Sequence, residues 1–164
     1  ILYVDILRAL PVLVLLILVY FALPFAGLVL DPFPAALAAL SLAMAAYTAE
    51  VVRAGIQAVP RGQFEAAAAL GLHFLAALRK VILPQALRIV VPPHVSNCVS
   101  VMKDTALATV VTMPELMRQA QDAQALYANP SPLIGAAALY VAILWPLVRL
   151  TAWLEARSNR AYAR

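Results

Sequence analysis

The sequence predicts an all-α integral membrane protein that folds as one domain over residues 1–164. Hydrophobic residues make up 65% of the chain and charged residues only 12%, against roughly 45–50% and 25% in soluble domains. Uncharged stretches long enough to cross a bilayer, which takes about 20 residues, recur along the chain. Lys and Arg gather between these stretches, as charges in membrane-protein loops do. Because lipid lets apolar side chains face outward, this composition indicates a membrane protein.

Hydropathy predicts four membrane-spanning helices. A proline-rich turn, Asp31-Pro32-Phe33-Pro34, separates the first two. The third contains Arg88 and the pair Pro92-Pro93, which we expect to break its helix. The last is uncharged and is followed by Arg149, Arg157, Arg160 and Arg164. The expected spans are about 9–30, 35–54, 81–102 and 131–148.

The distribution of positive charge orients these spans. The segment 53–88 carries five Lys or Arg residues against one acid, Glu65, and the C-terminal tail carries its own arginines. Cytoplasmic loops are the ones enriched in Lys and Arg. We therefore expect the loop at about 55–80 and the C-terminus to be cytoplasmic, with residues 24–34 and 103–130 outside. The chain starts at Ile1 with no signal-peptide pattern, so we expect a piece of a longer protein that is incomplete at its N-terminus.

The cytoplasmic loop has its own helix signals. Pro60 suits a helix start, the run from Gln63 to Leu70 has high helix propensity, and Gly71 suits the position just after a helix. A second helix is expected from about His73, with a kink at Pro84. The first helix, of about two turns, is too short to be stable alone in water. It needs a surface to lie on, and the residues by themselves leave open an ordinary connecting loop or a docking element.

The spacing within this loop resembles a known motif. Glu65-Ala66-Ala67, then Gly71, then Val81-Ile82-Leu83-Pro84 is similar to the EAA loop of membrane permeases in binding-protein-dependent ABC importers. Three longer stretches resemble the polar amino acid permeases among them: AYTAEVVRAGIQAVPRGQFEAA, LPQALRIVVPPHVSNCVSVMKDTALA and MPELMRQAQ. The resemblance as a whole covers almost the entire chain.

The resemblance implies the multi-helix fold of type I ABC importer permeases, with a cytoplasmic coupling helix at about Arg61–Leu70. That helix would dock into a groove of an ATPase and transmit its movement during import of polar amino acids. The residues implied in this coupling are Arg61, Gly62, Phe64, Glu65, Ala66, Ala67 and Gly71. The implied partners are a cytoplasmic ABC ATPase dimer, a second permease subunit in a homo- or heterodimer, an extracytoplasmic amino-acid-binding protein and membrane lipid. The implied location is the bacterial plasma (inner) membrane, with several spans and a cytoplasmic C-terminus.

Polar residues near the end of the third span are candidates for the substrate pathway. Asn97, Ser100 and Asp104 share one helical face, and Lys103 and Thr105 flank Asp104 in a segment that resembles the family's KDT. Polar groups within a membrane are costly and often functional. Hydrogen bonding between helices explains the same pattern, so both interpretations stay open. Glu50 with Arg53, and Glu115 with Arg118, are spaced as structural ion pairs, and His94 fits a packed histidine.

Other classes of function fit the sequence less well. The net charge of +4 is spread out and no basic run alternates with aromatics, so no nucleic-acid partner is expected. No GxxxxGK[ST] is present, so ATP is expected on a partner chain, with no cofactor here. Cys98 is the only cysteine, and no catalytic or metal-ligating set is evident. The alternatives are an ABC permease for another small solute, an ion-coupled secondary transporter, a membrane enzyme and a structural scaffold.

Two departures from the family pattern affect the expected function. Ala9-Leu10 stand where the family usually has Gly-Thr, and Leu15 stands where a Gln is usual. If that Gln lines the pathway, this subunit is the non-binding partner of a heterodimer or favours a different amino acid. The family's first helix is absent from the sequence.

Overall fold

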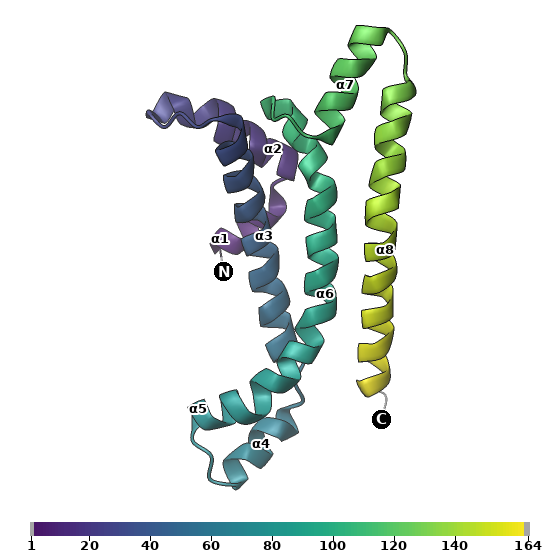
Figure 1. Cartoon of the computed structure of the whole chain (residues 1–164). Helices are drawn as coiled ribbons and strands as arrows, with labels where there is room; N and C mark the ends of the chain where they lie inside the picture. The colour runs from purple at the N-terminus through teal and green to yellow at the C-terminus, as the bar shows by residue number, and fades with distance from the viewer. Residues whose placement is uncertain (1, 163–164) are drawn as a thin grey trace.

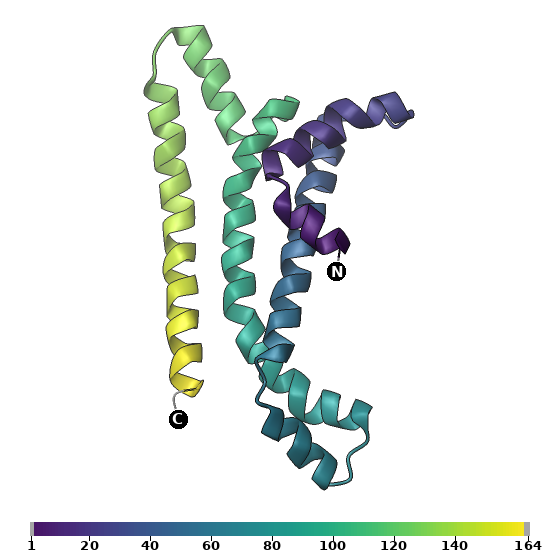
Figure 2. The same ribbon diagram turned by 180° about the vertical axis from the view of Figure 1, so that it is seen from behind.

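Three long helices lie side by side and form the body of the molecule. The computed structural model describes residues 2–162, and side chains through residue 157. Helix α3 (Pro32–Gln57) packs against α6 (Leu83–Asp104), and α6 packs against α8 (Ser131–Tyr162). Figures 1 and 2 show α6 between the other two. The all-α prediction is confirmed.

The N-terminal segment differs in shape from the expected span at 9–30. Helix α1 (Leu2–Ala9) ends before Pro11, and α2 (Val12–Ile17) continues as a π-helical turn, Leu18–Ala22, and a 3-10 turn, Leu23–Ala26. The two parts are bent by 100° at the break. Proline has no N–H to donate and disfavours helical geometry in the residue before it, so Pro11 separates the two helices.

Helix α6 passes through its two prolines without a break. We expected Pro92-Pro93 to interrupt it, but the helix is continuous from Leu83 to Asp104. Pro92 is buried, and membrane helices tolerate proline when packing supports the backbone. Helix α8 likewise extends beyond the expected 131–148, and Arg149 and Arg157 lie over the rings of Trp145 and Trp153, at 5.9 and 5.3 Å.

The number of clear spans is smaller than the four expected. Within residues 2–162, two helical stretches are long and apolar enough to cross a membrane: Pro32–Gln57 and Ser131–Arg157. The bent pair Leu2–Ala9 and Val12–Ala26 makes a third if it is one broken span. Helix α6 has the length but carries Arg88, Lys103 and Asp104. Its neighbours α3 and α8 pack against it on two sides.

The two ends of the molecule carry different elements. Helices α4 (Arg61–Ala69) and α5 (Phe74–Ala77) lie at one end, together with the end of α8. Helix α7 (Leu116–Tyr127) and the turn after α2 lie at the other end in both views. The segments that charge had assigned to one side of the membrane are therefore grouped at one end of the fold.

Each end of the molecule has a buried cluster of its own. One joins α2, α3 and the 3-10 helix η4 (Thr105–Val111), with Leu16 and Val111 among its fully buried side chains. The other joins Val59, Ile82 and Ala86 at the end near α4. Small residues at the α3 interface, including Ala39 and Ala46, let helix backbones approach closely, as is usual in membrane proteins.

Helix α3 packs tightly against α6 at Gly55. A Cβ atom built on Gly55 lies 2.2 Å from Cγ2 of Val90 and 3.5 Å from the carbonyl oxygen of Ala86. No side chain fits in this space unless Val90 or a backbone moves. Gly55 therefore fixes how near the two helices lie at the end that carries α4.

We predict that Gly55→Ala destabilises the protein, because overpacking a close contact costs about 1–3 kcal/mol. Adding Val90→Ala should recover most of the loss, since Val90 supplies the clashing methyl group. Thermal denaturation of the purified membrane protein measures both effects. Gly135→Ala is the matched control, because a Cβ on Gly135 in α8 meets nothing within 4 Å. Equal melting temperatures for the Gly55 and Gly135 variants would contradict the prediction.

Candidate coupling helix and polar groove

Helix α4 matches the expected coupling helix almost residue for residue. It runs from Arg61 to Ala69, and Pro60 stands before its first residue with an extended ψ of 136°. Pro60 thereby sets the direction in which the chain leaves α3, and its carbonyl accepts a hydrogen bond from the Gln63 N–H at 2.9 Å. The expected boundaries were about Arg61–Leu70.

Gly71 ends α4 in the way its position in the sequence indicates. Its φ is +73°, in the left-handed region that only glycine adopts readily. The Gly71 N–H donates to Ala68 O at 2.9 Å, and the Leu72 N–H donates to Ala67 O at 3.1 Å. This pair of bonds is a Schellman motif, which satisfies the last carbonyls of the helix.

One face of α4 is fixed to the rest of the chain. Ala67 is only 2% exposed, and Gln85 of α6 donates from Nε2 to Gln63 Oε1 at 3.0 Å. The buried cluster of Val59, Ile82 and Ala86 lies beside this contact. Helix α4 is therefore anchored to the start of α6. Ala67 serves this anchor, and its side chain offers no surface to a partner.

The other face of α4 is open. The remaining predicted coupling residues on the helix are all exposed: Arg61, Gly62, Phe64, Glu65 and Ala66. Three large apolar side chains at the same end were not predicted: Leu70, Phe74 and Leu75 are 80%, 72% and 67% exposed. Their apolar character within a charged loop was the available signal. The result is a protruding apolar surface with charged edges.

A groove of about 240 Å³ lies between α2, α3 and α6. Asn97, Ser100 and Asp104 of α6 line it, so three of the five pathway candidates meet in one place. Tyr47 and Met44 line the facing side on α3. The helical spacing of the three polar residues predicted this shared face. The groove lining includes one carboxylate and, among the described residues, no Lys or Arg.

The other two candidates lie outside the groove lining. Lys103 is exposed. Thr105 begins η4, and its hydroxyl donates to Met102 O at 2.7 Å. This bond is local to the helix end, so the structure gives Thr105 a role in ending α6. Leu15, the position of the expected Gln, is buried in the core of α2 and α3 and also lies outside the groove lining.

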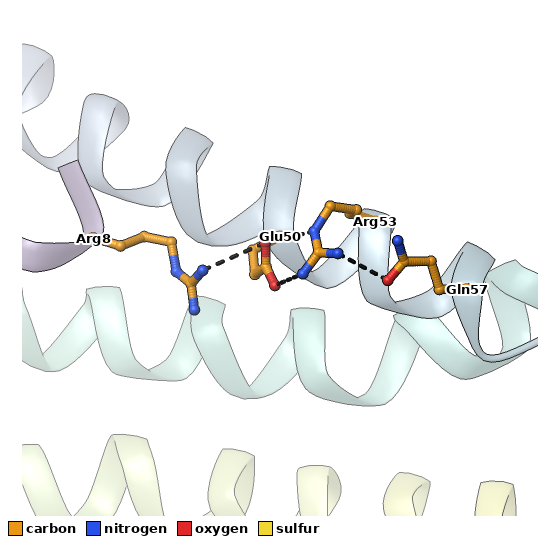
Figure 3. Close-up of polar contacts among 4 residues, drawn as sticks. All are labelled: Arg8, Glu50, Arg53 and Gln57. Atoms are coloured by element: carbon orange, nitrogen blue, oxygen red, sulfur yellow. Dashed lines mark hydrogen bonds and ion pairs between the residues drawn. The ribbon is translucent and has the colours of Figure 1, made fainter. Parts of the chain in front are cut away.

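A charged cluster joins α1 to α3 near the groove (Figure 3). The expected pair of Glu50 and Arg53 is present, with Arg53 Nε donating to Glu50 Oε2 at 2.9 Å. Arg53 Nη1 also donates to Gln57 Oε1 at 2.8 Å. Arg8 of α1 is an unexpected member, with Nη1 3.4 Å from Glu50 Oε2. Sequence spacing could reveal the pair within α3 but not the partner from another helix.

The end of the molecule opposite α4 shows a different arrangement from the one expected for Glu115. Its carboxylate does not pair with the Arg118 side chain but accepts hydrogen bonds from the backbone N–H groups of Met117 and Arg118, at 2.7 and 2.6 Å. A carboxylate is favourable there because helix N-termini carry unpaired N–H groups and positive potential. The Arg118 guanidinium pairs with Asp122 at 3.2 Å instead. His94 is packed as expected, 3.4 Å from Thr48 Oγ1.

Comparison with known proteins shows which family the chain belongs to. Residues 2–160 match the sequence model of a protein family, the binding-protein-dependent transport system inner membrane component. The chain belongs to this family. It is therefore a membrane-spanning permease subunit of the inner membrane and a transport component rather than an enzyme. Its transport system, by definition of the family, works with a binding protein and an ATPase.

Individual relatives agree with this assignment. The permease is 38% identical over 164 residues to the L-cystine transport system permease protein TcyB of Bacillus subtilis, covering 99% of this chain and 70% of that one. It is 39% identical to the arginine transport system permease protein ArtQ of the same organism, covering 87% and 66%. A crystal structure of an amino acid ABC transporter with histidines superposes with a TM-score of 0.88 at 36% identity, over 94% and 73%. The predicted permease fold is thus confirmed.

We predict that Gly71→Ala loosens the end of α4 in the permease. A Cβ at positive φ costs about 1–2 kcal/mol, and a Cβ here meets no other atom within 4 Å, so conformational strain is the whole effect. Amide hydrogen exchange at Leu70 and Leu72 should speed up about tenfold, because 1.4 kcal/mol corresponds to a factor of ten. Gly62→Ala is the control, since Gly62 has open space and no positive φ. Unchanged exchange in the Gly71 variant would contradict the proposed cap.

Proposed function

We propose that this permease is the translocation subunit of an ATP-driven importer for polar amino acids, with α4 as its coupling helix. The observation that carries the proposal is the form of α4: a short helix anchored by Ala67 and Gln63, with its other face open at one end of the bundle. A helix of this length needs a second surface to lie on. An ATPase groove provides one for Phe64, Glu65 and Arg61.

The proposed mechanism transmits movement through packed helices. Closure of two ATPases on ATP displaces α4, which is anchored to α6 through Gln85. Because α3 and α6 are in close contact at Gly55, the two helices move together at this end. Their opposite parts carry Tyr47, Asn97 and Asp104 of the groove, so displacement of α4 changes the groove. Repetition in a second permease subunit gives alternating access.

The proposed partners follow from the two ends of the molecule. The end with α4 and α5 faces an ATPase dimer in the cytoplasm, and the C-terminus lies on the same side. The end with α7 faces the amino-acid-binding protein. Many large side chains on α8, including Ile134, Val141 and Trp145, are more than half exposed. They fit lipid or the second permease subunit, which completes the importer as a homo- or heterodimer.

The groove supports a small zwitterionic substrate. Asn97 and Ser100 offer hydrogen-bond donors and acceptors, and Asp104 offers a partner for an ammonium group. Relatives are named for L-cystine, glutamine and arginine transport. The three named substrates share the ammonium and carboxylate groups of an amino acid. The amide, hydroxyl and carboxylate groups that line the groove suit such a substrate. Lys103 and Thr105 flank Asp104 in the sequence but lie outside the groove lining.

We predict that Glu65→Lys uncouples ATP hydrolysis from uptake. Glu65 is exposed on α4, so the change leaves the fold intact while reversing a charge at the proposed interface. Mismatched charge at an interface costs several kcal/mol, so uptake should fall about tenfold or more. The measurement compares uptake and ATPase activity in proteoliposomes. Arg157→Glu, a charge reversal at an exposed residue of α8 at the same end of the molecule, should leave coupling unchanged. Equal behaviour of the two variants would sink the assignment of α4.

Uptake of labelled amino acids tests the substrate class. Cells with and without the gene should differ in uptake of at least one polar amino acid, and Asp104→Asn should weaken that uptake. A panel including cystine, glutamine, arginine and histidine covers the chemistry that the groove suits. Identical uptake of every amino acid in the two strains would favour the alternative, a permease for another small solute.

A further inference from the structure

The ion pair between Arg8 and Glu50 lies directly beside the groove. Glu50 is three residues beyond Tyr47 on α3, and Tyr47 lines the groove. Val12, which lines the groove from α2, follows Arg8 by four residues. Arg8 and Glu50 therefore tie together the two chain segments that form one side of the groove, at its end toward α4.

Helix α1 is set at a sharp angle to the helix that follows it. Helices α3 and α6 are held together at this end by the close contact of Gly55 with Val90 and by the polar contact of Thr48 with His94. Helix α1 meets α2 at the bend before Pro11 and packs on α3 through a face that buries Val4. Its side chains at Leu2, Tyr3 and Ile6 are more than half exposed. Figures 1 and 2 show α1 lying across α3 rather than within the bundle.

Glu50 keeps a partner when Arg8 leaves. Its carboxylate is bound by the guanidinium of Arg53 through both Nε and Nη2, independently of Arg8 (Figure 3). Separating an ion pair is most costly when it strands a charge without a partner. Here Arg53 compensates Glu50, and the Arg8 side chain is 37% exposed, so it is not enclosed by the rest of the chain. The geometry thus leaves Glu50 paired when this contact opens.

We propose that Arg8 and Glu50 form a releasable latch at the inner end of the groove. In the closed state Arg8 holds α1 across α3. During transport α1 swings away at the Pro11 bend, Arg53 alone neutralises Glu50, and the groove becomes accessible from the side of α4. Arg8 and Arg53 share one carboxylate. Removing Arg8 therefore releases α1, whereas removing Arg53 leaves Glu50 with Arg8 as its partner and strengthens the closed state. This proposal rests on the proposed transport function.

The test uses the complete importer, assembled with its ATPase, in inside-out membrane vesicles. Cys98→Ser removes the only native cysteine, and Ser100→Cys places a reporter in the groove. The rate of labelling by a membrane-impermeant maleimide added on the α4 side measures opening. Arg8→Gln should speed labelling about threefold and Arg53→Gln should slow it by a similar factor, the range expected for a half-exposed ion pair.

Arg157→Gln is the control, because it removes an exposed arginine from the same end of the molecule. It should label at the parent rate. Shifts of Arg8→Gln and Arg53→Gln in the same direction, or rates equal to the control, would overturn the latch. If the ion pair were purely structural, its loss would lower the amount of assembled importer, and the two variants would not shift the labelling rate in opposite directions. Labelling needs no substrate, so failure of amino acid uptake and failure of the latch are separate results.

Discussion

The close packing of α3 against α6 at Gly55 is the constraint on which the rest of the structure depends. With a glycine here, Val90 enters the space of a missing side chain, and the helices lie close at the end that carries α4. The buried cluster of Val59, Ile82 and Ala86 extends this contact to the loop between them. Helix α4, too short to hold its own shape, thereby gains a fixed position. The exposed surface of α4 and the groove between α2, α3 and α6 are thereby connected through the packed pair of α3 and α6.

The charged clusters lie at contacts between helices. In a membrane, ionisable side chains are costly and are usually paired. Glu50 meets this requirement twice, with Arg53 on its own helix and Arg8 on α1. At the opposite end, Glu115 is bound to the backbone of α7 and to the hydroxyl of Tyr140, at 3.2 Å. The α7 end thus has a carboxylate bound to the backbone and to a hydroxyl, and the cluster of α1 and α3 has one that is shared by two guanidinium groups.

Local signals in the sequence predicted α4 well and its surroundings poorly. Pro60 and Gly71 set the ends of α4 by their own backbone preferences, which need no neighbours. The face shared by Asn97, Ser100 and Asp104 follows from helical periodicity alone. The burial of Ala67, the continuity of α6 through Pro92 and the partnership of Arg8 with Glu50 depend on contacts between distant segments. No local pattern encodes them. Hydropathy placed a span at 9–30 but could not show that a separate helix, α1, precedes it at a sharp angle.

The docking of α4 on an ATPase is the central claim, and site-specific thiol protection measures it most directly. In a Cys98→Ser background, a single cysteine replaces Phe64 or, as control, Asp122. Each variant is labelled with and without the purified ATPase. The ATPase should protect the cysteine at position 64 and leave position 122 unchanged, because only α4 enters the partner's groove. Equal labelling at position 64 with and without a bound ATPase would contradict the account.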